Sequence, residues 1–259
     1  MGEREELVLA YRILAAHGVV DAYGHVSMRS MRNPKRYLPA RATAPELVTA
    51  DDILEFDLDS NPVKDPGVPL YLERYIHGEI LKHRPEVNAV VHNHSPTVIP
   101  FGITTVPLRP LCNTAAFIGE GVPVFEVRDF QESGDIIVKT PHLGAALART
   151  LGRKPAALMR GHGAVVVGES LMLAVVRSVY LELSARLQIQ AMLIAGPGGK
   201  IVYLDEREVA ATTGRQASAG TWKRSWDLWC AKAQAQIDAE RRAKRRKTAG
   251  GARRMRRSK

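Results

Sequence analysis

The sequence predicts a single α/β domain. Segments with the 3.6-residue spacing of buried helices alternate with short runs of β-branched residues along most of the 259 residues. Apolar residues make up 45% and charged residues 25% of the chain, which favours a folded globular protein over a disordered one. No apolar run reaches the roughly 18 residues of a membrane-spanning helix, and the charged start MGERE is not typical of a signal peptide or a lipid anchor.

Helical spacing of apolar residues recurs along the chain. In the first such segment Leu7, Tyr11 and Leu14 fall on one face, and Gly18 ends the helix. The second segment can begin at Pro69, which suits a first turn. Helices are expected at 3–17, 69–84, 142–152 and 171–196, and in the segment with Trp222, Trp226 and Trp229. The spacing of these tryptophans predicts a packing face, within the domain or against another subunit.

Short runs rich in valine, isoleucine and aromatic residues, bounded by turn-forming residues, predict the strands. Two of these runs are joined by the tight turn RGHG at 160–163. The expected strands lie at 24–30, 51–63 (with the turn that follows), 89–94, 122–129, 135–140 and 200–205, and as a pair within 155–170.

Basic residues are concentrated at the end of the chain. Residues 241–259 hold eleven lysines and arginines and no acid, so a chain with a formal net charge of +10 has a charge of −1 without them. Such a run cannot bury apolar surface, and we expect a catalytic domain at 1–240 and a solvated, mostly disordered tail at 241–259. A weak, non-specific contact of the tail with nucleic acid is the functional alternative.

The cysteine content predicts the compartment. Cys112 and Cys230 form neither a disulfide framework nor a zinc ribbon, so a reducing cytoplasm is expected.

The strand at 89–94 ends in two histidines, His92 and His94. Because strand side chains alternate between faces, both imidazoles point the same way. Two imidazoles side by side are a poor packing choice and a good start to a metal site. The best third ligand is His162, between two glycines of the RGHG turn, although a single histidine in a turn is more often a surface residue. Three histidines would leave an open coordination position, as in catalytic sites.

Glu73 lies on the predicted helix just before this strand, four residues ahead of His77. Residues four apart share a helix face, so a simple surface pair is one interpretation. The functional alternative is a carboxylate close to the metal that acts as an acid, a base or an exchangeable ligand.

Three blocks of sequence resemble the class II aldolase/adducin family in their order and separations, over roughly residues 5–196. These blocks are YGHVSMR, LERYIHGEILKHRPEVNAVVHNHSPTVIPFG and MRGHGAVVVG. The resemblance implies a three-layer α/β/α fold around a mainly antiparallel sheet, often assembled as a homotetramer with active sites between subunits. It also implies that His92, His94 and His162 bind one divalent metal ion (Zn2+, Mn2+ or Fe2+) and that Glu73 is the catalytic carboxylate. The adducin branch lacks these histidines, so their presence favours an enzyme.

The chain departs from the family's sugar-phosphate aldolases at three phosphate-binding motifs. YGHVS has His25 in place of an asparagine, LPARATAP has Arg41 and no Ser-Gly pair, and YLE has Tyr71 where a serine is expected. Small hydroxyls and free backbone N–H groups suit a phosphate, so their loss predicts a flat or apolar substrate with a carboxylate, which Arg41 can bind. The altered motifs are similar to a subgroup that acts on aromatic acids, in which a histidine is expected at Asn113. Arg41, Tyr71 and Asn113 are the expected substrate-binding residues.

We therefore expect a metal-dependent carbon–carbon lyase that decarboxylates a hydroxylated aromatic or heteroaromatic carboxylate through a metal-stabilised enolate. Glu73 or His25 would deliver the proton that restores aromaticity. The same ligands suit a non-heme Fe(II) oxygenase acting on a phenolic substrate, and an aldolase acting on a non-phosphorylated substrate is a second alternative. A scaffold that binds partners through its basic tail is a third alternative, and it predicts no bound metal.

Overall fold

The computed structural model describes residues 2–119, 121–216 and 220–257. Within these residues the chain forms a seven-stranded sheet in the order β3-β2-β1-β4-β7-β6-β5. Neighbouring strands are antiparallel, except for the parallel pair β5 and β6. The strands are β1 (His25–Arg29), β2 (Arg36–Leu38), β3 (Phe56–Asp57), β4 (Ala89–Asn93), β5 (Val124–Phe125), β6 (Ala156–Met159) and β7 (Gly163–Gly168).

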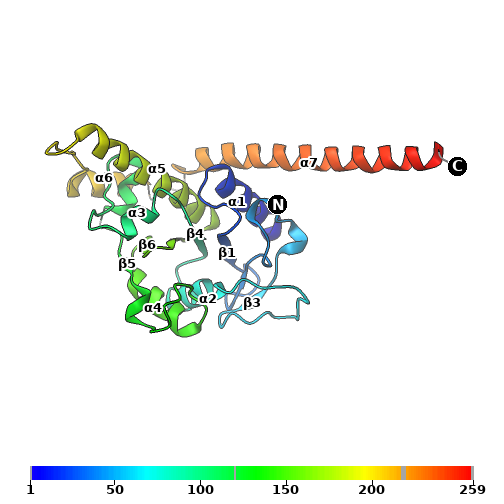
Figure 1. The fold of residues 1–259 in the computed structure, drawn as a ribbon, viewed down its shortest axis with the longest axis horizontal. Coiled ribbons are helices and arrows are strands. Elements are labelled where there is room, and N and C mark those ends of the chain that lie inside the picture. The colour runs from blue at the N-terminus through cyan, green and yellow to red at the C-terminus, as the bar shows by residue number, and fades with distance from the viewer. Residues whose placement is uncertain (1, 120, 217–219, 258–259) are drawn as a thin grey trace.

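Helices cover both faces of the sheet (Figure 1). The α-helices are α1 (Glu3–Ala16), α2 (Arg74–His83), α3 (Ile99–Gly102), α4 (Pro141–Leu151), α5 (Leu171–Ala195), α6 (Glu206–Gln216) and α7 (Lys223–Arg257). Short 3-10 turns are η1 (Pro45–Leu47), η2 (Ala50–Asp52), η3 (Asn113–Ile118) and η4 (Val127–Asp129).

Alternate residues of the central strands enter two separate hydrophobic cores. On β4, Ala89 and Val91 belong to the core that also contains residues of α1, α5 and α7, whereas Val90 belongs to the core formed with α2 and α4. This is the period-two alternation of a sheet buried on both sides. The predicted three-layer α/β/α fold with a mainly antiparallel sheet is therefore confirmed.

Local signals explain where two helices begin. The Thr140 side chain accepts a hydrogen bond from the Leu143 N–H at the start of α4, where Pro141 occupies the first turn. Ser170 accepts from the Leu173 N–H in the same way at the start of α5. Each cap satisfies a backbone donor that has no partner inside the helix.

The helix predicted at 69–84 begins five residues later in the structure, at Arg74. The preceding segment is held by a neighbouring loop instead: the Pro69 carbonyl accepts from the Ala42 N–H, and the Tyr71 hydroxyl donates to the Thr43 carbonyl. Glu73 consequently occupies the N-cap position of α2 rather than its interior.

Two expected strands are irregular in the structure, and strand β2 and helices α3 and α6 were not predicted. The segment 135–140 contributes backbone groups to the candidate site instead of to the sheet, and 200–205 forms no strand. Helix α6 has an N-terminal signal that the sequence analysis lacks: Asp205 and Glu208 each accept a hydrogen bond from the backbone N–H of the other. This reciprocal pair is a capping box.

The three tryptophans near the C-terminus pack within the domain. Trp222, Trp226 and Trp229 are at most 9% exposed. The Tyr180 ring lies 5.4 Å from the ring of Trp222 and 5.9 Å from that of Trp229, and the His17 ring lies 4.6 Å from Trp229. The predicted packing face thus joins α7 to α5 and α1.

The basic segment continues α7 as far as Arg257, with a helical backbone where we expect a disordered tail, and Figure 1 shows this end of the helix pointing away from the other elements. Residues 258 and 259 lie outside the described residues. A domain boundary at 240 and a nucleic-acid contact stay predictions. In the part of the chain that is described, no helix is both long and apolar enough to cross a membrane.

Candidate metal centre

Strand β4 carries the first two candidate ligands. It lies between β1 and β7, with His92 opposite His25 on one side and Val165 on the other. His92 is fully buried, and His94 follows just after the end of the strand. The central position of β4 holds both imidazoles in place.

His162 reaches the same point from the turn between β6 and β7. Gly161 has a φ of +65°, a conformation that residues with side chains rarely adopt. A Cβ on Gly163 would collide with the carbonyl oxygen of Asn93, so only glycine lets the turn approach β4 this closely. Glycine is therefore required on each side of His162 for a different reason: the positive φ at Gly161 and the close approach to Asn93 at Gly163.

Glu73 completes a group of four side chains, here called the ligand group: Glu73, His92, His94 and His162. Each offers one ligand atom, and these atoms lie within 4.8 Å of one another. His94 Nε2 is 3.1 Å from the Nε2 atoms of both His92 and His162. Glu73 Oε2 is 3.4 Å from the same two atoms. The structure thus brings together all three predicted metal ligands and the predicted carboxylate.

Backbone groups orient the ligand group. His92 Nδ1 donates to the Ala164 carbonyl and His162 Nδ1 donates to the Ile136 carbonyl, each at 3.2 Å. These bonds leave Nε2 of each neutral ring with a lone pair directed at the others. Converging lone pairs repel unless a cation lies between them, and this orientation of imidazoles by carbonyls is usual in metal sites. The donor set therefore fits a divalent metal ion.

The members of the ligand group shift one another's pKa values, and Glu73 raises the pKa of His162 although burial lowers it. Burial alone would raise the pKa of Glu73, but the adjacent His92 and His162 outweigh it and hold that pKa well below its usual range. Burial and the neighbouring imidazoles lower the pKa of His94 to about 4. At neutral pH Glu73 is ionised and His94 is neutral, the forms in which they bind metals.

His25 and Tyr71 lie beside the ligand group. The His25 ring centroid is 5.0 Å from that of His92 and 4.6 Å from that of Tyr71. Tyr71 is also oriented by its hydroxyl, which donates to the Thr43 carbonyl at 2.6 Å. The His25 ring thus contacts both Tyr71 and the candidate ligand His92.

The other two predicted substrate-binding residues make contacts of their own. Arg41 Nε is 2.5 Å from Asp52 Oδ1, so one edge of the guanidinium is already paired. Asn113 lies at the start of η3, where its backbone and side-chain oxygens accept from Gln216 of α6. The contacts of Asn113 are thus with α6, and its predicted role stays a prediction.

The positions of His77 and Ser27 beside the candidate site were not predicted from the sequence. His77 is not on a surface helix face, because it is 1% exposed and contacts His25 and Ser27. The alternation of β1 could have placed Ser27 beside His25, but the partner on α2 depends on tertiary packing. The contribution of the 136–138 backbone to the site was not predicted, because the sequence of this segment resembles a strand.

The Class II Aldolase and Adducin N-terminal domain matches residues 5–189. The chain belongs to the class II aldolase/adducin family. It is 35% identical to the decarboxylase tropJ of Talaromyces stipitatus, over 84% of this chain and 88% of that protein. It is 30% identical to the 3,4-dihydroxyphthalate decarboxylase of Arthrobacter keyseri, over 81% of this chain and 85% of that protein.

A solved structure shares the fold. The L-fuculose 1-phosphate aldolase of Glaciozyma antarctica aligns with a TM-score of 0.74 and 24% identity, over 92% of this chain and 90% of that one. The three-layer arrangement of this family is therefore present here.

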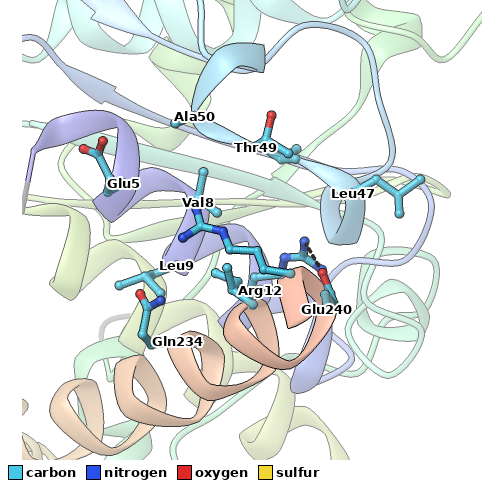
Figure 2. Close-up of a pocket in the computed structure, with 12 residues that line it drawn as sticks. Glu5, Val8, Leu9, Arg12, Leu47, Thr49, Ala50, Gln234 and Glu240 are labelled. Carbon is cyan, nitrogen blue, oxygen red and sulfur yellow. Dashed lines mark hydrogen bonds and ion pairs between the residues drawn. The ribbon is translucent and has the colours of Figure 1, made fainter. Parts of the chain in front are cut away.

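A cavity of about 210 Å3 lies elsewhere, between α1, the loop with η1 and η2, and α7 (Figure 2). Val8, Leu9 and Ile237 are among its apolar lining residues. Arg12 and Glu240, which pair at 3.1 Å, also line it. No member of the ligand group lines this cavity, so it is separate from the metal centre.

Proposed function

We propose that this protein is a metal-dependent decarboxylase that acts on a hydroxylated aromatic or heteroaromatic carboxylate. The observation that carries the proposal is the ligand group, in which three imidazole nitrogens and one carboxylate oxygen from distant parts of the chain converge. The relatives support the reaction, since two that align over most of their length are decarboxylases. The name of one specifies 3,4-dihydroxyphthalate, a ring with neighbouring hydroxyl and carboxylate groups.

The residues of the ligand group suit a resident divalent cation. His92, His94 and His162 would hold it, with Glu73 in reach as an acid, a base or a further ligand. When bound, the cation supplies a Lewis acid that stabilises negative charge on a substrate oxygen. Zn2+, Mn2+ and Fe2+ are all compatible with this nitrogen-rich donor set.

The protein's own groups have separate tasks in the reaction. The bond between the ring and the carboxylate carbon breaks, CO2 leaves, the electron pair stays with the ring, and a proton takes the vacated position. Glu73 and His25 are two titratable groups beside the ligand histidines and are the proposed candidates for handling that proton. The Tyr71 ring packs against the His25 ring at an angle of 42°, and two aromatic rings here suit contact with an aromatic substrate.

Arg41 is the proposed partner for a substrate carboxylate. Asp52 holds the guanidinium through Nε, and the two Nη groups then remain for a bidentate pair with a carboxylate. Loss of the phosphate-binding motifs favours such a substrate over a sugar phosphate.

The test is CO2 release under strict anaerobiosis from protein loaded separately with Zn2+, Mn2+ or Fe2+. 3,4-Dihydroxyphthalate and other hydroxylated aromatic acids serve as substrates, and phthalate, which lacks the hydroxyls, is the control. Metal-dependent release of CO2 with formation of the hydroxylated acid supports the proposal. Turnover that requires O2 would replace it with the oxygenase, and aldehyde release from a non-phosphorylated hydroxy ketone would replace it with the aldolase.

Assembly and location extend the proposal. We propose a homotetramer, as the family resemblance implies, and light scattering of the purified protein would measure it. A cytoplasmic location is proposed from the two free cysteines, Cys112 and Cys230, and fractionation of the source cells would test it.

A further inference from the structure

A chain of three buried polar side chains lies next to the candidate metal centre. Ser27 and His25 are two residues apart on β1 and therefore face the same side of the sheet, toward α2. His77 of α2 lies between them: its Nδ1 is 2.7 Å from Ser27 Oγ, and its Nε2 is 2.5 Å from His25 Nδ1. Ser27, His77 and His25 are 0%, 1% and 4% exposed.

The hydrogens of this chain follow from the number of donors. Among the described residues, the hydrogen-bond partner of Ser27 Oγ is His77 Nδ1. If His77 Nδ1 carried the hydrogen, Ser27 would accept, and its own buried hydroxyl hydrogen would have no acceptor, which folded proteins avoid. If Ser27 donates instead, His77 carries its hydrogen on Nε2 and donates it to His25 Nδ1. His25 then carries its hydrogen on Nε2.

Two further observations support this arrangement. Burial lowers the pKa of His77 to about 3, so the ring is neutral at physiological pH and carries one hydrogen. Among the described residues, His25 Nε2 has no hydrogen-bond partner and is not one of the fully buried unpaired polar atoms, so this atom keeps some solvent exposure. The hydrogen on Nε2 is thus unpaired within the described residues, on a ring whose centroid is 5.0 Å from that of His92.

We propose that Ser27 and His77 are positioning residues that hold His25 as a neutral hydrogen-bond donor, through Nε2–H, to an anionic oxygen of the substrate. This inference rests on the proposed decarboxylase function and assigns His25 a narrower part in it. A neutral imidazole that lost this hydrogen would become an imidazolate, so His25 binds and polarises the oxygen. Glu73, which is ionised at neutral pH, then takes a proton from a substrate hydroxyl and passes it to the ring carbon that CO2 leaves. Substrates must also present an acceptor oxygen to His25.

The tautomer can be tested without turnover. A neutron crystal structure of the full-length, zinc-loaded protein in D2O should show deuterium on His25 Nε2, His77 Nε2 and Ser27 Oγ. Deuterium on His25 Nδ1 and His77 Nδ1 would overturn the inference. Since no substrate is present, this result is independent of whether the proposed reaction is correct.

Kinetics of paired variants test the positioning role. His77→Gln keeps an amide nitrogen where Nε2 was, whereas His77→Leu removes the donor. We expect His77→Leu and Ser27→Ala to lower kcat by about 10–100-fold with a smaller change in KM, as for other groups that orient an imidazole, and His77→Gln to recover most of the loss. Ser178→Ala, which removes an equally buried hydroxyl on α5, is the control for stability and should keep normal kcat.

The outcomes distinguish the positioning role of Ser27 and His77 from the proposed decarboxylase function. Wild-type kcat in both His77→Leu and Ser27→Ala, or equal losses in His77→Leu and His77→Gln, would overturn the positioning role. Should the wild-type protein release no CO2 from any acid, the proposed function fails, and the deuterium positions still decide the tautomer.

Discussion

Replacing Gly163 with alanine tests whether the close approach of the β6–β7 turn to β4 builds the metal centre. The added Cβ would overlap the Asn93 carbonyl oxygen and would lie 2.9 Å from its carbon and 3.2 Å from His94 Cα. These atoms are backbone of a central strand and cannot rotate away, so the strands must separate. Overpacking of this kind costs about 1–3 kcal/mol, or about 2–12 °C in Tm for a domain of this size.

The same separation moves His94 relative to His162, and we expect a clear loss of bound metal. Gly18→Ala is the control for a loss of stability away from the candidate site, because Gly18, unlike Gly163, has a positive φ of 68° and a Cβ there would meet nothing within 4 Å. It should lose about 1–2 kcal/mol from backbone strain and keep its metal. Urea unfolding of the metal-free proteins and metal analysis after dialysis measure both effects. A Gly163→Ala protein with full metal content would refute the reasoning.

Three further predictions concern the site. Glu73→Gln should keep its metal, because three histidines remain, and lose about 100-fold or more in turnover; near-normal CO2 release would remove Glu73 from the reaction. Chelation should abolish turnover and lower the Tm, and added divalent metal at 100 times its Kd should restore about 2.7 kcal/mol of stability, measured by calorimetry. Burial lowers the pKa of His77 to about 3, so between that pH and about pH 6.5 the unfolded chain binds a proton at this residue that the folded chain does not bind. The free energy of unfolding is therefore unaffected by His77 above about pH 6.5. It falls by up to about 1.4 kcal/mol per pH unit as the pH drops toward 3. His77→Gln should flatten that part of an acid-unfolding curve, and an unchanged slope would contradict the assignment.

The candidate metal ligands could be predicted because their signals are local. Strand alternation alone placed His92 and His94 on one side, and the glycines around His162 indicated a tight turn with an unusual backbone. The convergence of the two segments depends on β7 lying next to β4, which the family resemblance implied and no spacing could show.

The errors arose where tertiary contacts outweigh local preference. The segment 135–140 is rich in β-branched residues, yet its backbone serves the site: the Val138 N–H donates to Glu73 Oε1, and the Ile136 carbonyl accepts from His162. The start of α2 was displaced because Pro69 and Tyr71 are tied to the 42–43 loop. His77 resembled half of a surface pair, because burial beneath β1 leaves no mark in helical spacing.

The order of the strands has a consequence for the chain as it leaves the ribosome. β4 emerges long before β7, yet β7 is its neighbour in the sheet and carries the turn that ends beside it. Until about residue 168 has been synthesised and has left the exit tunnel, one edge of β4 is without its partner, and His92 and His94 lack the third imidazole. A nascent chain that stalls earlier therefore exposes two histidines and an apolar strand edge. When β7 is complete, it pairs with that edge of β4, and the turn before it brings His162 to the two histidines.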